Sequence, residues 1–236
     1  MKRIKFFTAA IMVLAISTSV KAQFSTGADL VSSYVWRGIP QDRTVTGNPG
    51  LGSPNIQPYV SFTTGKLTIG SWASGSFLGN VKEVDLYATY TLSSALALTV
   101  TDYNWGFSNS YFNYGTGSDH LFEAALAYSG SGSFPISASL NTFFAGAADK
   151  KTNGDQAFST YIELSYPISE NAKLIAGASL FESNAVYGTT GFGVTNIALK
   201  VSKSIAITDK FSLPVYGVLG TNPYTKNAFS VAGITL

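Results

Sequence analysis

The sequence lacks cysteine and is poor in charge. None of its 236 residues is Cys, one is His, and only 12% are Asp, Glu, Lys or Arg, whereas ordinary soluble domains carry about 25% charged residues. Disulfides therefore cannot stabilise the chain, and a cysteine–histidine zinc site is excluded. No glycine-rich strand-to-helix turn suggests a phosphate-binding loop. We expect neither a metal nor a cofactor.

Long apolar runs are also missing. After residue 22, no segment approaches the roughly 20 apolar residues of a membrane-spanning helix. Glycine and aromatic residues are abundant instead, with 23 Gly and 14% Phe, Trp and Tyr. In an exported chain this composition is typical of a transmembrane β-barrel. A soluble β-sandwich is the alternative, but its water-facing positions should carry more charge.

The first 22 residues have the pattern of a secretory signal peptide. Lys2, Arg3 and Lys5 precede an apolar core over residues 6–16, and small residues flank Lys21 at the end. Cleavage before Gln23 is predicted, which leaves residues 23–236 as the mature domain. A membrane anchor is the alternative, although the apolar core is short for one.

Removal of this segment changes the charge balance. The whole chain has 15 basic and 13 acidic residues, and four of the basic ones lie in residues 1–22. The formal charge thus changes from +2 to −2. The basic pI of the precursor therefore gives no reason to expect a nucleic-acid partner.

Residues of alternating polarity recur along the mature chain and predict twelve β-strands. Their approximate ranges are 27–38, 55–63, 67–77, 82–92, 96–107, 120–129, 135–144, 157–166, 173–181, 193–202, 211–220 and 227–236. The connections after even-numbered strands are short, and most of those after odd-numbered strands are longer. Outer-membrane barrels have short periplasmic turns and longer external loops. We therefore predict an all-β, transmembrane, antiparallel up-and-down β-barrel in the bacterial outer membrane, with external loops at 39–54, 108–119 and 145–156.

Aromatic residues gather near the predicted strand ends on the parity that should face lipid. A spanning barrel carries such aromatic girdles at both membrane interfaces. The interface candidates are Tyr34, Trp36, Phe62, Tyr90, Phe122, Tyr128, Phe158, Tyr166 and Phe211.

The opposite parity should face the barrel interior, where water or a partner solvates charge. The candidate pore-lining residues are Asp29, Arg37, Glu83, Asp85, Tyr87, Glu123, Tyr161, Glu163 and Lys200. Five of these are acidic and two are basic. Because a guanidinium can bind a carboxylate through two hydrogen bonds, we expect Arg37 to pair with Asp85 or Glu83.

Several short segments are similar to one known family. Ser33-Tyr34-Val35-Trp36-Arg37-Gly38-Ile39, after a signal peptide, resembles the start of the TorF-type porin family. Gln57-Pro58-Tyr59, Gly70-Ser71-Trp72-Ala73-Ser74 and Glu83-Val84-Asp85-Leu86-Tyr87 look similar to the next segments of that family, over roughly 27–90. The resemblance implies an outer-membrane barrel with a pore role. It implies no particular substrate and no binding residue.

Two interpretations of the interior compete. An acidic constriction would give a passive, narrow, weakly cation-preferring channel for small solutes or ions. A salt-bridged network would fill the barrel, and the protein would then be an accessory barrel that acts through its external loops. Twelve strands lie between filled eight-stranded barrels and open sixteen-stranded ones, so strand number leaves both open.

An outer-membrane hydrolase is a third and weaker alternative, because a hydrolase needs a nucleophile and a base within hydrogen-bond reach. The single histidine, His120, lies at the external rim beside Asp119. Neighbouring residues in a strand point to opposite faces, so Asp119 is poorly placed to orient His120. We therefore expect no enzyme.

Overall fold

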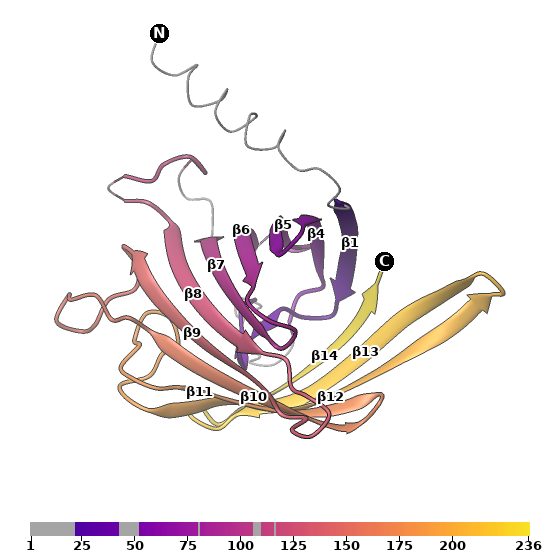
Figure 1. Cartoon of the computed structure of the whole chain (residues 1–236). Helices are drawn as coiled ribbons and strands as arrows, with labels where there is room; N and C mark the ends of the chain where they lie inside the picture. Colours follow the sequence, from indigo (N-terminus) through magenta and orange to yellow (C-terminus); the bar gives the residue numbers. More distant parts are fainter. Residues whose placement is uncertain (1–21, 43–51, 80, 106–109, 116) are drawn as a thin grey trace, which may run out of the picture.

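The computed structural model describes residues 22–42, 52–79, 81–105, 110–115 and 117–236. In this part of the chain, twelve antiparallel strands form a closed barrel and two very short strands form a separate hairpin (Figure 1). The barrel strands are β1 (Gln23–Val31), β4 (Asn55–Thr64), β5 (Leu67–Ser76), β6 (Lys82–Thr91), β7 (Leu96–Trp105), β8 (His120–Tyr128), β9 (Ser137–Gly146), β10 (Thr160–Ser169), β11 (Ala172–Ser179), β12 (Gly193–Thr208), β13 (Phe211–Asn222) and β14 (Asn227–Thr235). The all-β, up-and-down, twelve-strand prediction is confirmed. Among the described residues, no helix has the length and apolarity needed to cross a membrane.

Each barrel strand pairs with its neighbours in sequence, and β1 closes the ring against both β4 and β14. Successive side chains alternate between the interior and the outer wall, as strand geometry requires. On β6, for example, Glu83 and Asp85 are buried inside, whereas Leu86 is 43% exposed outside. The outer wall is apolar because the outward positions of most strands carry Leu, Ile, Val, Phe or Tyr.

The connections alternate as expected. Those at one end of the barrel, for example 65–66, 92–95 and 170–171, are short, and we call this end the turn end. The longer connections, which include 32–54 and 180–192, lie at the opposite end, which we call the loop end. Residues 1–21 of the predicted signal peptide and most of the predicted loop 39–54 lie outside the described residues.

The first predicted strand, 27–38, is wrong in its second half. The barrel strand β1 ends at Val31, and the chain continues as a hairpin made of β2 (Val35–Trp36) and β3 (Ile39–Pro40). We call residues 33–42 the plug hairpin. Val35 pairs with Pro40 and Trp36 with Ile39, so Ile39 and Pro40 belong to this hairpin and not to an external loop.

The β12–β13 hairpin is longer than expected, because the predicted turn at 205–210 is mostly strand. Pairing of β12 with β11 ends at Val201, and pairing of β13 with β14 begins at Val215. Between these points the two strands pair only with each other. This segment, residues 203–214, projects from the turn end as a two-stranded ribbon (Figure 1, yellow).

Candidate functional site in the barrel interior

The tip of the plug hairpin is a two-residue turn made of Arg37 and Gly38. Both residues have positive φ, 51° and 78°, which is the geometry of a type I′ hairpin turn. A Cβ atom at Gly38 would lie 1.9 Å from the carbonyl oxygen of Thr195, on β12. Only glycine fits this contact. Because Gly38 has no side chain, the tip of the hairpin packs directly against the backbone of β12.

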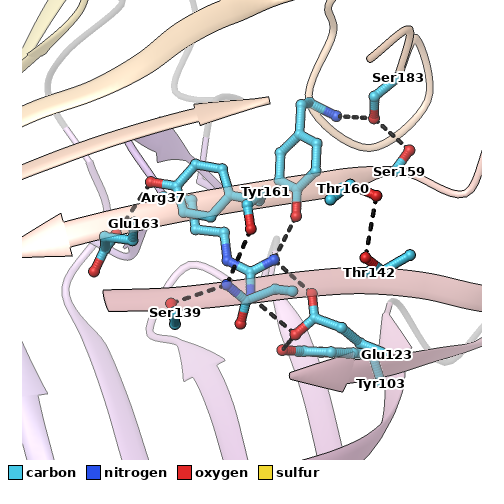
Figure 2. A network of polar contacts seen from close by, with 12 residues as sticks. Arg37, Tyr103, Glu123, Ser139, Thr142, Ser159, Thr160, Tyr161, Glu163 and Ser183 are labelled. Atoms are coloured by element: carbon cyan, nitrogen blue, oxygen red, sulfur yellow. Dashed lines mark hydrogen bonds and ion pairs between the residues drawn. The ribbon is translucent and has the colours of Figure 1, made fainter. Parts of the chain in front are cut away.

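Arg37 forms an ion pair with Glu123, on β8. Its two terminal nitrogens lie 2.5 and 2.9 Å from the two carboxylate oxygens, so the pair is bidentate (Figure 2). Arg37 also donates to the hydroxyl of Tyr187, and Tyr103 donates to Glu123 at 3.2 Å. The expected pairing with Asp85 or Glu83 is therefore wrong: the turn carries Arg37 across the lumen to β8.

Aromatic rings surround the hairpin tip. The Arg37 guanidinium carbon lies 4.4 Å from the ring centroid of Trp36 and 4.9 Å from that of Tyr161. Trp36 stacks on Tyr187 with ring centroids 5.5 Å apart, and it also contacts Phe143. Cation–π contacts in such a desolvated place are worth about 2 kcal/mol.

The prediction that Tyr34 and Trp36 lie at the membrane interface is wrong. Tyr34 is only 7% exposed, and its ring lies 5.4 Å from that of Trp72. Both residues lie in the lumen because β1 ends at Val31 and the chain turns inward. The strand parity inferred from sequence no longer applies beyond that point.

Backbone contacts tie the plug hairpin to two further strands. The Thr195 hydroxyl donates to the carbonyl of Arg37 at 3.2 Å, and the Asn222 amide donates to the carbonyl of Gly38 at 3.3 Å. At the base of the hairpin, buried Asp42 accepts from the Ser33 hydroxyl. The plug hairpin follows β1 in sequence and contacts β8, β12 and β13. Because these strands lie on other sides of the barrel, the hairpin spans the lumen.

Glu83 and Asp85 lie behind the hairpin, in a buried acidic pair. The Trp105 indole donates to Glu83 at 2.5 Å, and one oxygen of Asp85 has no hydrogen-bond partner. Burial, followed by the charges of these two carboxylates, raises the pKa of the Tyr34 phenol well above its ordinary value. Tyr34 therefore stays neutral beside them. Glu83 and Asp85 face inward, and both are 5% exposed or less; that they line a pore stays a prediction.

The remaining pore-lining candidates also face inward. Asp29 accepts hydrogen bonds from the hydroxyls of Tyr216 and Thr235, and the Tyr87 ring lies over Gly70. Glu163 accepts from the Tyr161 hydroxyl at 3.1 Å.

Below the plug hairpin, toward the turn end, the lumen contains a cavity of about 260 Å³. Arg37 and Gly38 of the plug hairpin line the cavity, together with Glu163, Asn196 and Lys200 of the barrel wall. Lys200 also lines a second hollow of about 310 Å³ beside the β10–β11 turn. Lys200 therefore lies between the cavity and the hollow at the turn end.

Of the other interface candidates, seven lie on the outer side of the protein: Phe62, Tyr90, Phe122, Tyr128, Phe158, Tyr166 and Phe211. Tyr90, Phe158 and Tyr166 are about half exposed, at 49%, 53% and 50%. Phe211 lies on the projecting ribbon and not on the barrel wall. That the others meet lipid stays a prediction.

His120 lies on the outer wall under a loop. Its Nδ1 atom is 2.6 Å from Asp102, a residue of β7 that faces the same way, and its Nε2 atom is 2.6 Å from the carbonyl oxygen of Tyr111. The Tyr114 ring stacks on it at 4.0 Å. Because both ring nitrogens are engaged, this cluster anchors a loop and leaves neither nitrogen open to a nucleophile.

Sequence reasoning missed Tyr187, Thr195 and Asn222, because each contacts the hairpin only through the closure of the barrel. One signal for the hairpin was present. Gly38 follows a run of β-forming residues and precedes Ile39, which is the pattern of a tight turn between two strands.

No protein-family model matches the chain, and no curated protein matches it. The resemblance to the TorF-type porin family thus stays a prediction.

Proposed function

We propose that this protein is an outer-membrane barrel for small solutes or ions that is closed by its plug hairpin and conducts when the hairpin leaves the lumen. The observation that carries the proposal is the position of Arg37. The hairpin that carries Arg37 follows β1, and Arg37 pairs with Glu123 on β8. Residues of β12 and β13 donate hydrogen bonds to the backbone carbonyls of the hairpin tip. An apolar outer wall and alternating connection lengths support a barrel in the outer membrane.

The charge of the open state follows from the same contacts. In the closed state Arg37 neutralises Glu123, and Glu83 and Asp85 are buried. Displacement of the hairpin removes the arginine and leaves these three carboxylates facing the lumen. Rings of carboxylates favour cations, so the weak cation preference predicted from sequence belongs to the open state.

Planar-bilayer recording tests the proposal. The wild-type protein is compared with a variant in which residues 33–42 are replaced by Gly and Ser at equal length. A matched control carries a ten-residue Gly and Ser replacement at 203–212, which is exposed and lies on the projecting ribbon. We expect long closures in the wild type and the control, and a several-fold larger, cation-selective mean conductance in the hairpin variant.

Two results would contradict the proposal. If the folded hairpin variant inserts and passes no current, the lumen is not a path, and the accessory-barrel alternative is favoured. If the wild type already conducts as well as the variant, the hairpin does not close the barrel.

A further inference from the structure

Two lysines face each other at the turn end of the lumen, and neither forms a salt bridge with a described carboxylate. Lys173 on β11 and Lys200 on β12 are direct cross-strand partners. Like charges in this position destabilise a sheet. Among the described residues, no carboxylate lies within 4.0 Å of either ammonium group. The Lys200 ammonium instead lies 4.2 Å from the ring centroid of Tyr216. We call Lys173 and Lys200 the lysine pair.

Of the lysine pair, Lys200 lines the cavity and Lys173 lines the neighbouring hollow, and the other end of the cavity offers acceptors. Glu163 faces it, and the side-chain oxygen of Asn196 is buried with no hydrogen-bond partner. Asn196 is 7% exposed. Because an unpaired buried polar atom is unfavourable, a donor from a bound molecule would remove this cost.

The distance between the two ends sets the length of a ligand. Asn196 and Lys200 are four residues apart on β12, and a strand rises about 3.3 Å per residue, so their Cα atoms are about 13 Å apart. An extended chain of three residues spans about 10 Å. Since the lysine side chains are long and flexible, the lysine pair can cover the remaining distance.

Apolar side chains form part of the cavity wall. Val31, Ile175, Val218, Phe229 and Val231 line it beside the polar groups. At about 260 Å³ the cavity is smaller than the roughly 300–1,000 Å³ of sites for drug-sized ligands. A small, elongated solute with an apolar middle therefore fits better than a compact sugar or a bare ion.

We propose that this cavity binds short peptides of about three residues, with the carboxylate at the lysine pair and the ammonium group at Glu163 and Asn196. The inference deepens the proposed function by naming the class of solute. Passage of the peptide through the barrel rests on the proposed function, whereas binding in the cavity does not. We place the entry at the turn end, where Lys200 lines both this cavity and the neighbouring hollow, so that binding itself does not require the hairpin to move.

Isothermal titration calorimetry with the full chain in detergent micelles tests this inference. Trialanine is the main probe. N-acetyl-trialanine lacks the ammonium group, trialanine amide lacks the carboxylate, and inorganic phosphate supplies an anion alone. We expect trialanine to bind, and each blocked peptide to bind at least about tenfold more weakly, which corresponds to about 1.4 kcal/mol.

Variants locate the site. Lys200→Met and Glu163→Gln should each weaken trialanine binding about tenfold, or about 1.4 kcal/mol. Lys203→Met is the matched control, because Lys203 lies on the ribbon of the same strand and is exposed. Heat-modifiable migration on gels checks that each variant is folded, and the comparison of peptides in the wild type holds even if a variant fails to fold.

Three results would overturn the inference: no binding of trialanine to the wild type, equal binding of trialanine and its amide, or equally tight binding of phosphate alone. The last would assign the lysine pair to simple anions, including phosphate headgroups. Peptide binding without conductance in the hairpin variant would instead contradict the proposed function and leave the binding site in place.

Discussion

The two halves of the barrel interior differ in what fills them. At the loop end, large side chains and the plug hairpin leave Phe143, Leu121 and Tyr161 at most 1% exposed. Toward the turn end, small hydroxyl residues face inward and bond one another across strands, as in Thr89 with Thr99 at 2.8 Å. The strand alternation is the same in both halves, so side-chain size and the inserted hairpin decide which half is filled.

The two ends of the barrel also differ in how completely their strands are paired. β1 pairs with β4 over nine residues, from Gln23 to Val31, but with β14 over only three. The ribbon projects from the turn end without a further strand on either side. The cluster of buried apolar and aromatic residues lies at the loop end, and we expect changes there to affect stability most.

Loss of the ion pair should have the largest effect. Arg37→Ala leaves Glu123 buried without its partner, and removal of one member of a buried pair costs about 3–5 kcal/mol. Urea unfolding in lipid vesicles measures this. The double variant Arg37→Met, Glu123→Gln should be less destabilised than the sum of its single variants. Strict additivity would show that the pair makes no direct contribution.

Truncation of Trp36 should have the next largest effect. Trp36→Ala removes the ring that packs on Tyr103, Trp105, Phe143 and Tyr187. Truncation of a large aromatic residue in a core costs about 3 kcal/mol. Phe112→Ala is the control, because Phe112 is 83% exposed. A similar loss of stability in both variants would contradict the assignment of Trp36 to the barrel core.

Removal of the ribbon should have the smallest effect. Replacement of residues 204–214 with a tight Asn-Gly turn keeps Lys203 opposite Val215 and removes pairs that the two strands make only with each other. We expect the unfolding free energy of the barrel to change by no more than about 0.5 kcal/mol, as for surface changes away from packed features. Loss of folding would show that the ribbon contributes to barrel closure.

Much of the fold could be predicted because it depends on local pattern. Alternation marks strand faces directly, so Glu83, Glu123 and Lys200 were placed inward from the sequence alone. Boundaries were good to a few residues for most strands, as for 55–63 against β4. The error at 27–38 arose because the same alternation continues from β1 into a hairpin, and period alone cannot distinguish a continuing strand from one that folds back.

The sequence by itself determined the twelve-strand pattern, the two faces of each strand and the alternation of long and short connections. These follow from side-chain order and turn chemistry, which act over a few residues. Only the tertiary structure decided the partner of Arg37, the place of Trp36 and the separation of the lumen into a filled and a hollow half. Those depend on contacts between residues as far apart as Arg37 and Glu123, which closure of the barrel brings together.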